Sequence, residues 1–491
     1  MNPYAHSPAG SNRKRRPGTA RLRIRPGHVL APLAACLLAG CFNNPLPRMD
    51  SAVPAHWRHA PVVPARPPVD LHAWWKAFHD PLLVRLVDQA LKNNPDVAIA
   101  TEHLRAARAL YGVRQAPLRP QLSIHTDNPI DPDASASYFV IGFDATWELG
   151  LFGRGQAVGR IAAGHLGEAV ATLRAARVSL VAEVARDLVR LRAAQRQEQL
   201  AQTILDARQE QVHLVRTRVR LKLADQNDLA QAEAALAEAR AALAEPRMLA
   251  DQAAQRLALL LGREEPDPAW LKPAPLPQLG PQGPVAAPAA MLRSRPGIAQ
   301  AEARVIEAAG QLGIARADLY PRIGLGASTL WSTNIVNYRH NKGTNEIGTA
   351  GPLISMPLFD WGMRMAHKHA QAHLLKAAAL AYRKAVLTGV TEVETDLGNL
   401  QQLRERELAS IEACKSWQDA DRMQHTRRRL GLASELDGTT VTIAQARAEQ
   451  DLAAARSDRD IAFIALYKAL GGAPPLPARD DNAATAATEA Q

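Results

Sequence analysis

Aromatic residues, cysteines and long apolar runs are all scarce in this sequence of 491 residues. Aromatic side chains make up 4% of it, although hydrophobic residues together make up 47%, much of them alanine. Such a composition favours close packing of helix on helix over a core of bulky side chains. The three cysteines, Cys36, Cys41 and Cys414, are too few for a disulfide framework.

Residue sets typical of catalysis are also missing. Serine, cysteine and histidine form no recognisable nucleophilic set, no glycine-rich loop is placed to hold phosphate, and no paired carboxylates fall in a pocket-forming context. We therefore expect that the protein is not an enzyme and needs no cofactor. The formal net charge is +11, but residues 1–40 hold seven basic residues and no acidic one. Because the excess is mostly local to the N-terminus, we expect no nucleic-acid partner.

Proline, frequent elsewhere, is missing from residues 156–245 and 358–473. Both stretches consist mainly of Ala, Leu, Arg, Gln and Glu, the residues that lose least on entering a helix. Each is broken once, at 224–228 and at 433–437. The roughly 65 to 70 residues before each break would make a helix of about 100 Å. The chain is therefore expected to fold around two very long helical hairpins.

Apolar residues in these helices recur mostly at alternating spacings of three and four, which is typical of coiled coils. In the shorter helix of the first hairpin they are Leu229, Ala232, Leu236, Ala239, Leu243, Ala250, Ala253, Leu257 and Leu260. In the long helix before it they are Leu166, Val170, Leu173, Leu180, Val184, Leu188 and Leu191. Pro246 is predicted to kink the shorter helix, because its ring cannot join a helix interior.

The N-terminus has the pattern of an export signal. A basic segment ending at Arg25 is followed by an apolar run at 29–39, which is too short for a spanning helix. The run ends in Leu38-Ala39-Gly40-Cys41, which resembles the lipobox of bacterial lipoproteins. That resemblance implies a signal peptide over residues 1–40 and a covalent lipid on Cys41, the mature N-terminus. The alternative is an ordinary signal peptide that contains a cysteine.

Two further segments are expected to have no core of their own. Residues 41–70 are rich in proline, which favours an extended strap leading from the lipid to the body of the protein. The tail at 473–491 is rich in Pro, Ala, Thr and Asp and is expected to be disordered.

Three pairs of similar segments occur in the same order, which indicates an internal duplication. NPD at 94–96 matches RPG at 295–297 with an offset of 201, and LFGRG at 151–155 matches LFDWG at 358–362 with an offset of 207. RLKLA at 220–224 matches RLGLA at 429–433 with an offset of 209. We predict a first repeat at 71–265, a proline-rich linker at 266–288 and a second repeat at 289–472.

Each repeat is expected to begin with a helix, at 95–116 and 296–318, followed by two strands. The strands are predicted near residues 121–127, 137–147, 322–331 and 347–356. Period-two alternation puts apolar or aromatic residues on one face of the second and third strands: Phe139, Ile141, Phe143, Ala145 and Trp147, then Ile323, Leu325, Ala327, Thr329 and Trp331.

With glycines and polar groups on the other face, this alternation is typical of a transmembrane β-strand, although one segment alone would also suit a soluble sheet. Four strands cannot close a barrel, and open edges are not tolerated in lipid. Three chains would supply twelve strands, which can close.

Four motifs then resemble the TolC-like outer-membrane efflux lipoproteins (the OprM/NodT group). They are WWKAFHDP at 74–81, WELGLFGR at 147–154, PLFDWG at 357–362 and YKALGG at 467–472. The resemblance implies an α+β membrane protein: a homotrimer with a twelve-stranded transmembrane β-barrel, continued into the periplasm by an α-helical coiled-coil barrel. It also implies a location in the outer membrane, a periplasmic adaptor (membrane fusion) protein and an inner-membrane transporter as partners, and a passive exit duct for small molecules. Lys222, where the tip would often carry glycine, and Pro246 depart from the family pattern.

Two other functions stay open at this point. A type I protein-secretion duct shares the same architecture. A lipid-anchored periplasmic coiled-coil scaffold needs the long helices, but it has no use for four alternating strands with aromatic ends. The sequence does not name the exported substrate.

Charged residues gather at the two hairpin turns. In a trimer, rings of carboxylates at the narrow end would attract cations and pair with arginines, forming a gate. The alternative is that Asp and Asn side chains only cap the helices that follow. We favour capping for Asp228 and Asp437 and gating for Asp225 and Glu435. The arginines available for pairing are Arg220, Arg427, Arg428 and Arg429.

Three histidines, His367, His369 and His373, lie early in the second long helix. His369 and His373 are four residues apart and share a face, so they form a weak candidate for a divalent metal site. No helical glutamate accompanies them. A solvated surface is the preferred interpretation, and no metal is expected.

Overall fold

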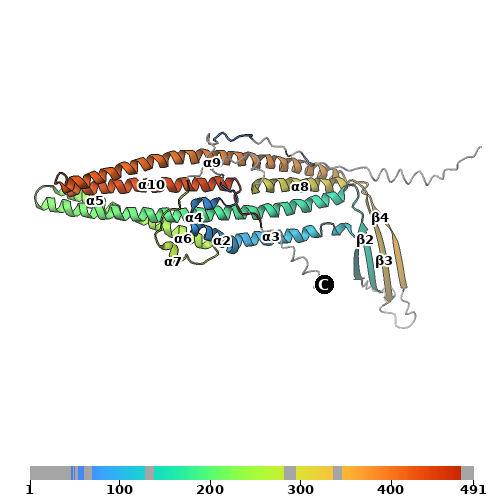
Figure 1. Ribbon diagram of the computed structural model, residues 1–491. Helices are drawn as coiled ribbons and strands as arrows, with labels where there is room; N and C mark the ends of the chain where they lie inside the picture. Colours follow the sequence, from blue (N-terminus) through green and yellow to red (C-terminus); the bar gives the residue numbers. More distant parts are fainter. Residues whose placement is uncertain are drawn as a thin grey trace, which may run out of the picture.

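Two helices of 67 residues run along the molecule, α4 (Arg154–Arg220) and α9 (Met363–Arg429) (Figure 1). The structure is a computed structural model and describes residues 46–47, 49, 54–59, 69–127, 138–280, 295–334 and 345–476. Each helix is about 100 Å long, and the prediction of two very long hairpins is confirmed. Among the helices of the described residues, none combines the length and the apolarity needed to cross a membrane.

The helices that return from the two turns differ. In the first half, α5 (Gln226–Ala241) and α6 (Ala244–Leu260) are separated by two residues, whereas in the second half α10 (Glu435–Ala469) is continuous. Pro246 is the third residue of α6, where a missing N–H leaves no intrahelical bond unmade. The predicted interruption of this helix at the proline is therefore confirmed.

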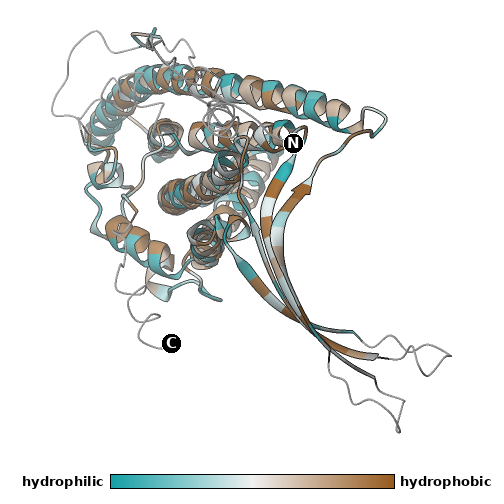
Figure 2. Cartoon of the chain, turned by 90° about the vertical axis from the view of Figure 1, so that its right-hand side faces the viewer, coloured by the Kyte–Doolittle hydropathy of each residue, from teal (hydrophilic) through white to brown (hydrophobic). Residues whose placement is uncertain are grey.

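Shorter helices pack beside the long ones and complete the helical layer, which is called the helical wall below. They are η1 (Trp74–Phe78), α2 (Pro81–Asn93), α3 (Pro95–Gly112), η2 (Ala116–Leu118), α7 (Pro268–Leu271) and α8 (Pro296–Ala317). The α3 helix ends four residues before the predicted boundary, because Pro117 has no N–H to donate to the Val113 carbonyl and the chain continues as the 3₁₀ helix η2. In Figure 1, α8 continues the line of α10 towards the sheet. Figure 2, which views the helices nearly end-on, shows them arranged in a curved layer, with the sheet extending from one end.

The sheet contains four antiparallel strands in the order β1 (Gln121–Asp127), β2 (Tyr138–Glu148), β3 (Arg322–Asn334) and β4 (Asn345–Ser355). All four predicted strands are confirmed within three residues at each end. The register aligns the predicted faces, since Ile141 lies opposite Trp331 and Trp147 opposite Leu325. One row across the sheet is apolar, Leu122, Ala145, Ala327 and Ala350, and the next is polar, Ser123, Asp144, Ser328 and Thr349.

The main core lies around the middle of the long helices, where two of the sequence motifs meet. Trp74 and Phe78 from η1 pack on Phe463 and Tyr467 from α10, with ring centroids 5.6 Å apart for the two phenylalanines. The Trp74 Nε1–H donates to the carbonyl of Gly472 at 3.1 Å. All four rings are buried, so aromatic residues of the two motifs stabilise the contact between η1 and the end of α10.

The coiled-coil pattern matches the burial. On α4, Leu173, Leu180, Val184, Leu188 and Leu191 are buried, and Leu166 and Val170 pack partly buried against them. Nearer the turn, Leu236 and Ala239 of α5, together with Leu243, form a second cluster with α4 residues. The predicted apolar stripes therefore bury the contact between neighbouring helices.

One predicted match between the two halves is wrong by two residues. The long helices are N-capped by Gly153 and Gly362, with φ of 81° and 80°, and the residues before them, Phe152 and Trp361, both have φ of 55°. These positions are 209 residues apart, so Gly153, and not Gly155, corresponds to Gly362. The reason is that the connection from strand to helix has two more residues in the second half, 356–362 against 149–153.

Parts of the proline-rich segments lie against the body. Trp57 is buried, and the Arg58 backbone N–H and the His59 ring both contact the Glu394 carboxylate on α9. In the linker, the Trp270 carbonyl accepts hydrogen bonds from Arg192 and Gln195 of α4. Residues 1–45 and 477–491, which include the predicted signal peptide, Cys41 and most of the predicted tail, lie outside the described residues.

Candidate functional site

The two hairpin turns have the same backbone geometry. In the first, the Leu223 N–H donates to the Arg218 carbonyl at 2.8 Å, and in the second, Leu432 donates to Arg427 at 2.8 Å. These are the six-to-one bonds of a Schellman motif, which needs one residue with positive φ. That residue is Lys222 in the first turn, with φ of 58°, and Gly431 in the second, with φ of 71°. Lys222 therefore departs from the family pattern in side chain but not in backbone.

Both helices that leave the turns begin with a capping box. In the first, Asp225 Oδ1 accepts from the Asp228 N–H at 2.8 Å, and Asp228 Oδ2 accepts from the Asp225 N–H at 3.2 Å. In the second, Ser434 Oγ accepts from the Asp437 N–H at 3.1 Å, and Asp437 Oδ2 accepts from the Ser434 N–H at 3.0 Å. Hydrogen bonds from the Ser434 side chain and backbone lower the pKa of the Asp437 carboxyl.

The structure thus places Asp228 and Asp437 in capping boxes, as expected for them. Asp225, for which gating was favoured, is itself the N-cap of α5 and is engaged by its own helix. The sequence alone left this open, because the N-cap position depends on whether the helix begins at Gln226 or a few residues later.

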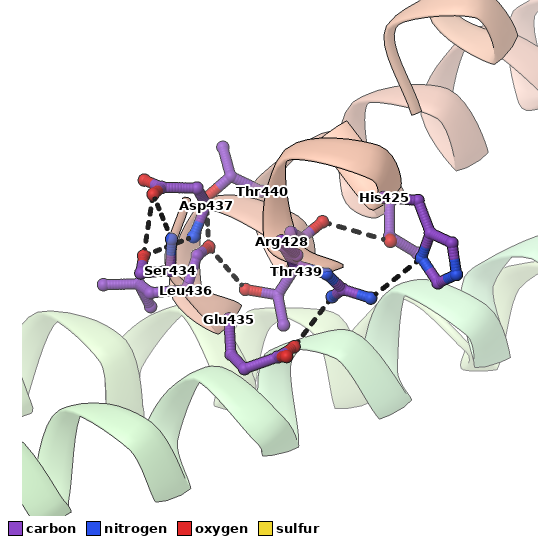
Figure 3. Close-up of polar contacts among 10 residues, drawn as sticks. His425, Arg428, Ser434, Glu435, Leu436, Asp437, Thr439 and Thr440 are labelled. Carbon is purple, nitrogen blue, oxygen red and sulfur yellow. Dashed lines mark hydrogen bonds and ion pairs between the residues drawn. The ribbon is translucent and has the colours of Figure 1, made fainter. Parts of the chain in front are cut away.

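Glu435 is the acidic residue that links two helices at the tip (Figure 3). Its Oε2 lies 2.7 Å from Nη1 of Arg428, at the end of α9, and the same guanidinium contacts Nδ1 of His425 at 3.0 Å. Arg428 also covers Gly438, where a Cβ would lie 2.4 Å from Nη1. Of the predicted arginines, Arg428 therefore pairs with an acid across the turn.

The other predicted arginines make different contacts. Arg220 donates to the Thr217 hydroxyl of its own helix at 3.2 Å. Within the described residues, no carboxylate lies at ion-pair distance from Arg220, Arg427 or Arg429. Near the turns, Arg428 with Glu435 therefore joins the two helices of the second hairpin, and Arg216 with Glu233 at 2.8 Å joins those of the first.

Sequence reasoning missed a charged network where the helices meet the sheet. Arg154, at the start of α4, contacts Glu148 at 3.0 Å and Asp318 at 2.6 Å, and Arg322 also pairs with Asp318 at 2.8 Å. Burial opposes the ionised form of Asp318, but the two arginines outweigh it and lower its pKa. The arginine of the WELGLFGR motif was the available signal, but its main partner is 164 residues away.

The histidines of α9 do not come together with other ligands. His367 contacts Gln371 of its own helix at 3.4 Å. Across the part of the chain that the structure describes, no group of three or more His, Cys, Asp or Glu side chains is arranged to hold a metal ion, so His369 and His373 have no third ligand there.

Long paired helices, an open four-stranded sheet with one apolar row, and two capped turns together suggest one architecture. The sequence model of the outer membrane efflux proteins matches residues 86–263 and again 287–472. The chain belongs to the outer membrane efflux protein family. It is therefore an outer-membrane efflux component, and the resemblance of the four motifs is confirmed.

Individual relatives agree with this assignment. The chain is 29% identical to the pyoverdine export outer membrane protein OpmQ of Pseudomonas aeruginosa, over 90% of this chain and 96% of that one. It is 27% identical to the toluene efflux pump outer membrane protein TtgC of Pseudomonas putida, over 90% and 94%. Among solved structures, the outer-membrane channel OprN aligns with a TM-score of 0.76 at 28% identity, over 89% of this chain and all of that one.

Proposed function

We propose that three copies of this efflux protein close their sheets into one twelve-stranded barrel and form a passive exit duct. The observation that carries this proposal is the open sheet. Strands β1 and β4 lie at its two edges, so within the described residues each has one side without a partner strand. On the face that carries the apolar row, large apolar side chains of these edge strands are more than half exposed: Leu122, Ile124 and Ile354.

Closure between copies explains this exposure. An unpaired strand edge cannot persist in lipid, because each unmet N–H and C=O group costs several kcal/mol there. If β1 of one copy pairs with β4 of the next, no edge remains. The 11 residues of β2 and of β4 suffice for a transmembrane β-strand, which needs about 9 to 11. The apolar row would then face lipid, and the polar row of Ser123, Asp144, Ser328 and Thr349 would face the duct.

The curved layer of helices would continue the duct into the periplasm for about 100 Å. Its tip would meet a periplasmic adaptor and an inner-membrane transporter, which supplies the energy. Small organic molecules are the proposed cargo, since the relatives include proteins named for toluene efflux and pyoverdine export. The two matches of the family model support an origin by duplication, with repeats at 71–265 and 289–472 joined by a linker at 266–288.

Strand insertion gives the direct test. Ile124→Arg places a charge on the apolar face of edge strand β1, and Ser123→Arg places the same charge on the polar face one residue away. A lipid-facing arginine costs about 2–4 kcal/mol near the bilayer midplane. We expect Ile124→Arg to lose most of the membrane-embedded trimer, measured by cross-linking in outer membranes, and Ser123→Arg to keep it. Equal losses in both variants would contradict the proposed barrel.

The lipid on Cys41 is proposed as a second, weaker anchor, attached after removal of residues 1–40. Cys41→Ser should abolish labelling of the protein by a radioactive fatty acid. If the strands span the membrane, the variant should stay in the outer membrane during carbonate extraction. Release of the unlipidated protein would instead favour a lipid-anchored scaffold.

A further inference from the structure

A groove on the helical wall combines unneutralised arginines with an exposed indole. It lies between α4, α9 and α10, and its cavity volume is about 650 Å³, within the range of small-molecule sites. Arg208 from α4, Arg406 from α9 and Arg447 from α10 line it, against a single carboxylate, Asp451. Arg406 is taken up by an ion pair with Asp458 at 2.9 Å.

The other two arginines keep their charge available. Among the described residues, no carboxylate lies within ion-pair distance of Arg208 or Arg447. Burial and then the neighbouring charge of Arg447 lower the pKa of Arg208, although the Glu238 carboxylate opposes the shift. The two guanidinium groups therefore repel each other across the groove. An anion between them would offset the repulsion and compensate for the burial of the two charges.

A buried amide positions one of these arginines. Gln211 is 8% exposed, and its Oε1 accepts a hydrogen bond from Arg208 Nη1 at 2.7 Å. The Gln211 amide nitrogen in turn faces the Thr440 hydroxyl at 3.4 Å. The guanidinium of Arg208 is therefore held at the groove and does not extend freely into solvent.

The remaining wall is apolar and aromatic. Trp417 from α9 lines the groove and is 41% exposed, so a large part of its ring is available to a ligand. Ile443 and Ala448, which are buried, also line it. A flat apolar ring bearing a carboxylate would match this combination, because the ring can stack on the indole while the guanidiniums bind the acid.

The groove lies on the side of the wall that would face the duct. A second cavity, lined by Arg456 and Arg459 of α10, is covered by the linker segment 273–279. Arg447 and Arg456 are nine residues apart, which at about 100° per residue puts them on opposite sides of α10. An open duct leaves room for the linker only on the outside, so the groove with Arg447 lies inside. This step rests on the proposed function.

We propose that this groove, formed by Arg208, Arg447 and Trp417, is a binding site for aromatic organic anions on their way through the duct. The site discriminates by charge: aromatic carboxylates bind, whereas neutral alcohols and amines of the same ring system bind weakly. This names a substrate class for the efflux protein, in which the anionic form of a weak aromatic acid is favoured.

Binding to the full-length, detergent-extracted protein tests the groove by isothermal titration calorimetry. The probes are 1-naphthoate, 1-naphthalenemethanol and 1-naphthylmethylamine, which share a ring and differ in charge. We expect 1-naphthoate to bind roughly tenfold or more tightly than the other two, since hydrogen bonds to charged groups each contribute about that much. The double variant Arg208→Gln/Arg447→Gln should lose this preference, while Trp417→Ala should weaken all three probes.

Arg174→Gln is the matched control, because Arg174 is an exposed arginine of α4 that lies 34 residues before Arg208. It should keep the preference for 1-naphthoate. Equal binding of the three probes to the unaltered protein would overturn the proposal. So would a loss of the preference for 1-naphthoate in Arg174→Gln as large as that in the double variant. Conductance measured on the same preparation tests the duct separately: a protein that binds 1-naphthoate selectively but conducts nothing would contradict the proposed function and not the site.

Discussion

The two halves of the chain solve the same structural problems with different residues, most clearly where coaxial helices meet. In the first half, Asn94 caps α3 by accepting from the Val97 N–H at 3.1 Å, and its amide donates to the Leu260 carbonyl at the end of α6 at 3.0 Å. In the second half, the matching residue is Arg295, which makes no side-chain cap and pairs instead with Glu392. The first joint is closed by a neutral hydrogen-bonded side chain, and the second by charges.

The second joint borders a cavity that charged residues line. A cavity of about 410 Å³ lies between Arg295, Asp396 and the end of α10 at Ala469. Burial, and then repulsion from Glu392, raise the pKa of Asp396 to about 6, although Arg295 opposes the shift. Within the described residues, Nη1 of Arg295 is buried without a hydrogen-bond partner. Hydrogen bonds of Asn94 thus stabilise the first joint, whereas the second joint keeps charged groups buried, which costs free energy.

The largest expected effect comes from opening the first joint. Asn94→Ala removes an N-cap and leaves the Leu260 carbonyl without its donor, which should reduce the free energy of unfolding by about 2–3 kcal/mol. Denaturant titration followed by circular dichroism measures this. Asn94→Asp keeps the cap acceptor and loses only the donor, so it should fall between. If Arg295→Ala in the second half reduced the free energy of unfolding more than Asn94→Ala, the proposed difference between the two joints would be contradicted.

At the second joint, ionisation of Asp396 should make the stability of the protein depend on pH. The Asp396 carboxyl has a higher pKa in the folded than in the unfolded protein, so it lowers stability as pH rises from 3.8 through about 6. Asp396→Asn should therefore stabilise the protein at pH 7, on the order of 1–2 kcal/mol, and flatten the curve in that window. Unfolding midpoints at pH 4 and pH 7 provide the measurement. An unchanged slope would mean that Asp396 does not carry this charge penalty.

Lys222 and Gly431, the residues with positive φ in the two turns, can be exchanged for each other. Lys222→Gly should stabilise the first turn by about 1 kcal/mol, because a side chain in the left-handed region costs that much. Gly431→Lys should destabilise the second turn by a similar amount, and the pair of exchanges should nearly cancel. Thermal unfolding of both single variants and the double variant checks this. Effects of the same sign would show that the two turns do not share a backbone requirement.

The ion pair between Glu435 and Arg428 at the tip is expected to have the smallest effect on stability. Its loss should nevertheless change function. Glu435→Gln removes an exposed contact to Arg428, which costs less than about 1 kcal/mol. Because this pair joins α9 to α10, its loss should let the tip splay and raise single-channel conductance. Asp225→Asn, which alters a cap within one helix, serves as the control and should change conductance less. The reverse order would restore Asp225 as the gate.

Most of the architecture could be predicted from the sequence because it depends on periodic patterns. Long proline-free stretches predicted the hairpins, and alternation predicted the strands and their apolar faces. What depended on single contacts between distant residues could not be predicted, such as Arg154 with Asp318 or Asn94 with Leu260. The roles of Asp225 and Glu435 were also beyond prediction, since both lie within one residue of a helix start and only the backbone decides which caps.

The central claim is that three copies jointly form one open path through the outer membrane. The most direct test is single-channel recording of the full-length, detergent-extracted protein in planar lipid bilayers, with the number of subunits per particle determined by cross-linking in the same detergent. The account predicts discrete conductance steps from a three-subunit particle. A protein that inserts into the bilayer as a single subunit, or as a trimer that conducts no ions, would contradict it.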